Sequence, residues 1–369
     1  MTRTTTRRDF LGSSTALTGL AFVSCELLAG HEACAQTKRR ETSVGGKRAL
    51  VIDVHAHCLV PEAMALMNLK IGATSSFRPD LNMMATVEQR LAVMDAQGID
   101  MQALSINPFW SKADRDLADK ICRLQNEKLA EACKAYPERF VAFATVSLQH
   151  PDLAAQQLED GVKKLGLRGA SIGASVNGDE LSDPKFHPFW AKVEELGVLV
   201  FIHPQADGAT ATLASRLKGN GYLSNVIGFP VETSIALSHL IFEGTLDKFP
   251  KLKICGAHGG GFLPSYMGRS DIGCLTLPSA CPGGPHGPIK KKPTEYLKQM
   301  YYDTMVFSPE GLRHLVAEVG ASQLVVGTDY PFPWTKTAVD EVLATPGLSD
   351  ADRVAILGGT AAKLLGVMT

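Results

Sequence analysis

The chain has 369 residues, of which 45% are hydrophobic and 20% are charged, so it is long and apolar enough to bury a large core. Its 37 Lys and Arg are balanced by 38 Asp and Glu, which gives a formal net charge of −1. That balance argues against a nucleic acid partner, because such partners are bound by a basic excess.

The first 35 residues have the composition of an export signal. The paired arginines Arg7 and Arg8 are followed by a charge-free apolar run over 17–25 and by the small residues Ala33-Cys34-Ala35. A basic start, a short apolar middle and a small-residue end are typical of a cleaved signal, and paired arginines indicate the twin-arginine route. The apolar run is too short and too broken for a membrane anchor. We therefore expect cleavage near Ala35 and a periplasmic protein.

The polar residues 36–48 are predicted to be a linker, and residues 49–369 to be a single domain. We expect no later run to be long and apolar enough to cross a membrane. No cysteine belongs to a C-x-x-C pair, which argues against a zinc ribbon. Cys274 and Cys281 lie in a Gly/Pro-rich stretch, where they could form a disulfide in an oxidising compartment if their geometry allows it.

From residue 49 onward, short apolar runs alternate with stretches of helical spacing. The helical stretches are 87–97, 116–136 and 152–165, and in the first of them Val87, Leu91 and Met94 fall on one face. Alternating strands and helices indicate a parallel sheet, and eight such units predict a closed (β/α)8 barrel of the TIM type. The predicted strands are 49–54, 101–106, 140–146, 167–172, 198–202, 252–257, 300–303 and 324–327.

Candidate metal ligands stand at the ends of four of these strands. The first strand leads into His55 and His57, which point the same way because residues two apart share a face. The fifth, sixth and eighth strands end at His203, His258 and Asp329. The carboxyl ends of barrel strands lie on one rim, so the five side chains are expected to converge there. Four imidazoles and a carboxylate suit Zn²⁺ or another divalent transition metal.

Four motifs carry a resemblance to a known family: IDVHAH at 52–57, FIHP at 201–204, HGGG at 258–261 and GTDYPFP at 327–333. In this order they resemble the amidohydrolase-related family that includes aminocarboxymuconate semialdehyde decarboxylase and related aromatic-acid decarboxylases. The resemblance spans about residues 50–369. It implies that His55, His57, His203 and Asp329 bind one divalent metal ion, zinc in preference to manganese. It also implies that His258 is the acid/base residue at a catalytic centre shared with Asp329.

The resemblance extends to two arginines. Arg78 matches a residue that binds the substrate carboxylate, and Arg269 matches one that reaches the active site of the neighbouring subunit, which implies a homodimer. A planar guanidinium suits a carboxylate because it donates two parallel hydrogen bonds. Strand four lacks the lysine that bridges two metals in binuclear relatives, so a single metal ion is expected.

The implied activity is decarboxylation of an aromatic or unsaturated carboxylic acid. The same residues would serve a hydrolase or hydratase of a lactone, an amide or an unsaturated acid, because function resides in the pocket rather than the fold. A non-catalytic binding protein is disfavoured by the presence of His258. Gln205 and Asn225 stand where the semialdehyde decarboxylase has tryptophans, so a less aromatic pocket is expected and the exact substrate does not carry over.

Overall fold

A computed structural model of the chain describes residues 39–69, 85–205, 208–281 and 289–367. The predicted export signal, residues 1–35, lies outside the described residues, and so does Arg78. Both stay predictions.

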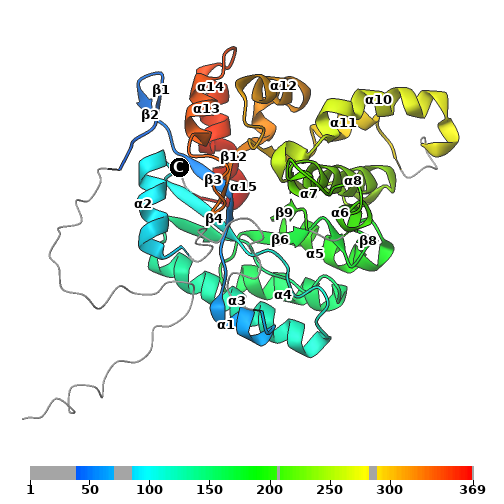
Figure 1. The fold of residues 1–369 in the computed structure, drawn as a ribbon, viewed down its shortest axis with the longest axis horizontal. Coiled ribbons are helices and arrows are strands. Elements are labelled where there is room, and N and C mark those ends of the chain that lie inside the picture. Colours follow the sequence, from blue (N-terminus) through cyan, green and yellow to red (C-terminus); the bar gives the residue numbers. More distant parts are fainter. Residues whose placement is uncertain (1–38, 70–84, 206–207, 282–288, 368–369) are drawn as a thin grey trace, which may run out of the picture.

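Eight parallel strands form the centre of the molecule (Figure 1). Their order in the sheet is β5-β4-β3-β12-β11-β10-β9-β6, and a parallel bridge between Ala144 and Ala170 links the segment just after β5 to β6. The sheet is therefore a nearly closed barrel, which confirms the predicted fold class, and each strand overlaps one predicted apolar run. The strands are β3 (Ile52–His57), β4 (Met101–Ser105), β5 (Phe140–Ala142), β6 (Gly169–Gly173), β9 (Leu199–His203), β10 (Lys253–Gly256), β11 (Tyr301–Asp303) and β12 (Leu324–Tyr330).

Helices surround the barrel and alternate with its strands (Figure 1). The long ones are α2 (Val87–Gln97), α3 (Arg115–Ala135), α4 (Pro151–Lys163), α5 (His187–Leu196), α8 (Gly228–Phe242), α10 (Leu263–Thr276) and α12 (Pro309–Val319). The shorter ones are α1 (Pro61–Leu66), α6 (Gly208–Thr212), α7 (Leu223–Val226), α9 (Thr245–Lys248), α11 (Pro293–Leu297), α13 (Ala338–Ala344), α14 (Asp350–Val354) and α15 (Thr360–Leu365).

Local sequence explains where the helices begin and end. The Thr86 hydroxyl accepts a hydrogen bond from the Gln89 amide, and the Gln89 side chain accepts one from the Thr86 amide, so the first turn of α2 is capped in both directions. The same helix ends at Gly98, which has φ 75°, a left-handed conformation that suits glycine. Asp114 caps α3 through the Leu117 amide. These signals confirm the helices predicted from spacing.

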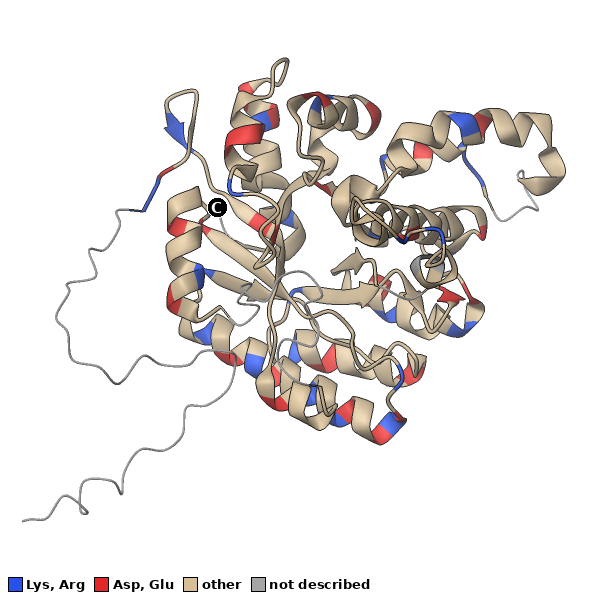
Figure 2. Ribbon diagram, in the orientation of Figure 1, with Lys and Arg blue, Asp and Glu red and all other residues tan. Residues whose placement is uncertain are grey.

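The core has two layers. Inside the barrel, side chains of alternating strand residues such as Val54, Phe201 and Val325 pack together, and Leu365 of α15 packs against them. A larger cluster fills the space between the strands and the outer helices. This is the packing expected of a filled barrel rather than a pore. Charged side chains of both signs are interspersed on the outer helices (Figure 2), in keeping with the near-zero net charge.

Part of the predicted linker is structured. Within 36–48, the strands β1 (Ser43–Val44) and β2 (Lys47–Arg48) form an antiparallel hairpin. Arg48 pairs with Asp100 at 2.7 Å, and Arg40 pairs with Asp340 on α13. The segment 39–48 is therefore attached to the barrel domain, because two of its arginines pair with carboxylates that the composition of 36–48 does not reveal.

One helical run, Leu223–Phe242, is long and apolar enough by composition to span a membrane, which sequence reading did not expect. It contains α7 and α8, and Leu237 and Leu240 are buried in the core between the barrel and its helices. Glu232 on the same run is buried and accepts a hydrogen bond from Ser175 at 2.8 Å. With these contacts, the run packs as one of the helices that surround the barrel.

Candidate active site

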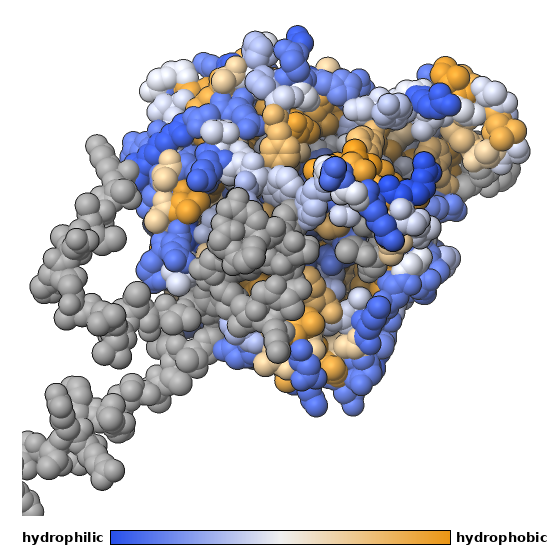
Figure 3. Space-filling view, viewed as in Figure 1, coloured by the Kyte–Doolittle hydropathy of each residue, from blue (hydrophilic) through white to orange (hydrophobic). Residues whose placement is uncertain are grey.

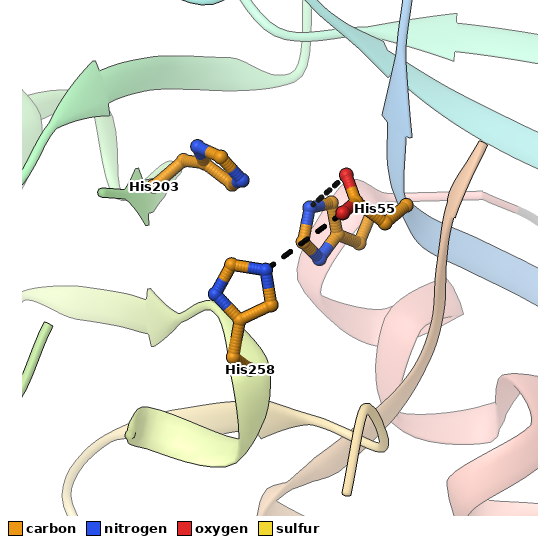
Figure 4. A group of neighbouring side chains, drawn as sticks. His55, His203 and His258 are labelled. Carbon is orange, nitrogen blue, oxygen red and sulfur yellow. Dashed lines mark ion pairs between the residues drawn. The ribbon is translucent and has the colours of Figure 1, made fainter. Parts of the chain in front are cut away.

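The five side chains predicted to converge do so at the carboxyl ends of β3, β9, β10 and β12. Figure 4 shows three of them, His55, His203 and His258, whose rings point toward one another. Ligand atoms of His55, His203, His258 and Asp329 lie within 4.8 Å of one another. His57 borders this group, with its Nε2 atom 2.9 Å from Asp329 Oδ1 and 3.0 Å from His55 Nε2. His258 therefore lies as close to the predicted ligands His55, His203 and Asp329 as these three lie to one another.

The orientation of His55 and His57 depends on an irregularity in β3. Ile52 and Val54 belong to the interior core, so strict alternation would turn both histidines outward. The pairing of β3 with β4 shifts register between Asp53 and Ala56, and both imidazoles lie inside with His203. Such bulges re-aim side chains next to active sites.

The cluster has the properties of a metal site. Both ring nitrogens of His203 are buried, and neither has a hydrogen-bond partner among the described residues. Oδ1 of Asp329 is buried as well, and the polar atoms nearest to it are the Nε2 atoms of His57 and His55, at 2.9 and 3.1 Å. Buried polar atoms without partners are costly and are rarely retained without a ligand. Imidazole nitrogen with carboxylate oxygen is a donor set for divalent transition metals. These atoms therefore fit the predicted metal ion.

The electrostatic environment favours the protonation states in which His203 and Asp329 can bind a metal. Burial and the neighbouring imidazoles of His57 and His55 hold the pKa of His203 well below its ordinary value. Burial opposes ionisation of Asp329, but His55 and the other imidazoles outweigh it and hold the pKa of this carboxyl well below its usual range. Neutral imidazole and ionised carboxylate are the forms that bind metals.

Two further residues orient the histidines of β3. Asp303, at the end of β11, lies 2.7 Å from Nδ1 of His55 and is fully buried. Ser105, at the end of β4, lies 2.9 Å from Nδ1 of His57. Sequence reasoning missed both residues. The available signal was their position on the same rim: Asp303 ends the predicted strand 300–303, and Ser105 is the last residue but one of the predicted strand 101–106.

Of the two predicted arginines, only Arg269 is among the described residues, and it is not part of this cluster. Arg269 is exposed on α10, a helix that extends away from the barrel (Figure 1). It does not line the cavity beside His258. Arg78 lies outside the described residues.

A cavity of about 390 Å³ opens beside His258. Its walls come from segments after β9, β10, β11 and β12, and they are more aromatic than the sequence indicated. Asn225 does stand in the wall in place of a tryptophan, but other loops supply aromatic rings. The aromatic lining residues are Phe229, Phe262, Phe307 and Trp334. A larger cavity, of about 790 Å³, lies beside the N-terminal hairpin and contains none of the predicted site residues.

Comparisons with known proteins agree with this geometry. A family model described as Amidohydrolase matches residues 52–367. Gamma-resorcylate decarboxylase of Rhizobium radiobacter is 35% identical over 292 residues, which cover 75% of this chain and 86% of that protein. The 2-amino-3-carboxymuconate-6-semialdehyde decarboxylase of Dictyostelium discoideum is 31% identical over 283 residues, covering 75% of this chain and 76% of that protein.

A solved structure of similar fold holds a metal and an inhibitor. The dihydroxybenzoic acid decarboxylase of a Polaromonas species, with bound manganese and 2-nitroresorcinol, matches with a TM-score of 0.74 at 29% identity. The match covers 86% of this chain and 97% of that one.

Proposed function

Because the chain belongs to the amidohydrolase family, as its motifs indicated, we propose that it is a metal-dependent decarboxylase of a small aromatic carboxylic acid. One observation carries the proposal: an aromatic-walled cavity of about 390 Å³ ends at His258, next to the cluster of metal-binding side chains. The relatives reported above are decarboxylases, and the Polaromonas enzyme holds manganese and an aromatic inhibitor.

The residues proposed to hold the metal are His55, His57, His203 and Asp329. Zinc is preferred and manganese is the alternative. When bound, a divalent ion supplies a positive charge that orients substrate oxygens and stabilises negative charge in the transition state.

His258 is proposed to move the proton. Its side chain is 14% exposed and lines the cavity, so it can meet a substrate held there. The protonated imidazole donates its proton to the ring carbon that bears the carboxylate. The bond from that carbon to the carboxylate then breaks, its electron pair stays with the ring, and CO2 leaves. Water returns a proton to the neutral imidazole, which completes the cycle.

The aromatic walls position the substrate. Phe307 and Trp334 lie with ring centroids 6.2 Å apart, and Phe229 lies 6.2 Å from His203. A flat ring can stack against such walls while its carboxylate faces the metal-binding cluster.

The test is CO2 release from a panel of hydroxybenzoates and unsaturated dicarboxylates, using protein whose metal content has been measured. We expect release from at least one hydroxybenzoate, and loss of that release when the metal is removed by a chelator. A fully metallated protein that releases no CO2 but hydrolyses a lactone would contradict the proposal and support a hydrolase.

A homodimer is also proposed, with Arg269 as the residue that crosses between subunits. Helix α10 and the segment after it expose large apolar side chains: Tyr266 is 65% exposed, Ile272 62%, Leu275 76% and Leu277 57%. Apolar side chains gather at the far end of α10 and on the segment after it (Figure 3). A disulfide between Cys274 and Cys281 links α10 to that segment, which answers the question left open by sequence. Exposed apolar patches of this kind mark protein interfaces.

Mixing two inactive variants tests this arrangement. In a hybrid of His258→Asn and Arg269→Ala subunits, one of the two sites has both an intact His258 and an intact partner arginine. Equal mixing should therefore restore about a quarter of wild-type activity, since half of the dimers are hybrids with one intact site. The control pairs His258→Asn with His203→Ala, both of which act within one subunit's site. Equal recovery in both mixtures, or none in either, would rule out the shared site.

A further inference from the structure

Asp303 is a buried carboxylate that contacts two parts of the candidate active site, His55 on β3 and the turn that carries His258. Its Oδ2 atom lies 2.7 Å from Nδ1 of His55 and accepts a hydrogen bond from the backbone N–H of His258 at 2.9 Å. Its Oδ1 atom accepts from the N–H of Gly259 at 2.8 Å and from the N–H of Met305 at 3.1 Å. The residue is fully buried. One side chain at the end of β11 thus joins residues from β3 and from the turn after β10.

The contact with His55 selects one form of its imidazole. A carboxylate oxygen that already accepts from the His258 N–H can receive a proton from Nδ1, but it has none to give. With a metal bound, His55 would therefore carry its proton on Nδ1, which leaves the lone pair of Nε2 for the ion. Outer carboxylates that fix a ligand histidine in this way strengthen metal binding in many proteins.

The contacts with the backbone hold an unusual turn. His258 has φ 55° and Gly259 has φ 64°, so two successive residues are left-handed. A left-handed histidine is disfavoured and persists only where surrounding contacts hold it. The two oxygens of Asp303 accept from both N–H groups of this turn, which fixes the direction in which the His258 ring points.

We infer that Asp303 is a positioning residue that sets the tautomer of His55 and holds the His258 turn. It thereby couples metal affinity to the placement of the proton donor. The inference rests on the proposed metal centre but not on the identity of the substrate.

Asp303→Asn tests the inference with little change in volume. The amide group must place an NH₂ where one of the two oxygens stood. In one orientation it faces His55 and the His258 N–H, and in the other it faces the N–H groups of Gly259 and Met305. In either orientation, the new NH₂ group faces N–H groups that are themselves hydrogen-bond donors. We expect metal to bind about 10–100-fold more weakly, as competition with a chelator measures it.

A matched control separates this effect from a general loss of stability. Asp100 is a buried carboxylate that accepts from the Val51 N–H at 2.8 Å and from Arg48 at 2.7 Å, next to β3 and β4 at their opposite ends. Asp100→Asn should lower the melting temperature of the metal-free protein without changing metal affinity. If Asp303→Asn lowered stability alone and bound metal within twofold of wild type, Asp303 would be merely structural and the inference would fail.

A second measurement uses wild-type protein, so a folding defect in the variant cannot affect it. In zinc-loaded wild-type protein with ¹⁵N-labelled histidines, NMR should show His55 protonated on Nδ1 and not on Nε2. The opposite tautomer would overturn the inference. Failure of wild-type protein to bind any divalent metal would instead contradict the metal centre itself.

Discussion

His258→Asn is expected to lower the rate of CO2 release by about 10²–10⁴-fold, the range that a positioned proton donor contributes. Asparagine is chosen because His258 has φ 55°, and asparagine adopts left-handed backbone more readily than alanine. Its amide can occupy the turn but cannot donate a proton to carbon. The measurement is kcat on the best hydroxybenzoate, together with metal content.

The metal content decides which role His258 has. Its ring atom lies within the 4.8 Å group together with His55, His203 and Asp329, so geometry alone also allows it to be a ligand. If His258 is the proton donor, the His258→Asn variant should keep its full metal content but turn over little substrate. Parallel loss of metal and activity in His258→Asn would make His258 a ligand, and the proposed proton transfer would then need another residue.

His203→Ala is expected to abolish both metal binding and activity. Both nitrogens of this ring are buried without a hydrogen-bond partner among the described residues, so a bound metal is the interaction that the ring is placed to make. A ligand at 100 times its Kd stabilises wild-type protein by about 2.7 kcal/mol, and this metal-dependent rise in melting temperature should vanish in the variant.

The matched control is His314→Ala on α12, a histidine whose side chain is 48% exposed. It should leave metal content, the metal-dependent thermal shift and turnover at wild-type levels. If His203→Ala kept full metal content and activity, the proposed ligand set would be wrong.

The parts of the site that the sequence predicts are those that depend on short segments of the chain. Each strand leading to the site was visible as an apolar run, and each of the five converging residues stands where such a run ends. The shared direction of His55 and His57 follows from the period of a strand. That both rings face the barrel interior does not follow, because Val54 faces inward too and only the shift of register after Asp53 resolves the conflict.

The hydrogen bonds around the cluster were harder to foresee. Asp303 lies 248 residues from His55 in the chain, and Ser105 lies 48 residues from His57. A lone aspartate or serine at a strand end has no distinctive pattern, so its partner depends on which strands become neighbours. The same holds for the cavity walls, where Trp334 and Phe307 come from separate loops.

By itself the sequence determined the barrel, the residues that converge at one end of it and the family, because strand period, apolar runs and motifs are properties of short segments. The tertiary structure alone decided that the segment 39–48 is attached to the barrel and that the pocket is aromatic. It also decided that Asp303 joins His55 to the turn of His258. These features depend on contacts between segments far apart in the chain, whose distances are set only when the barrel closes.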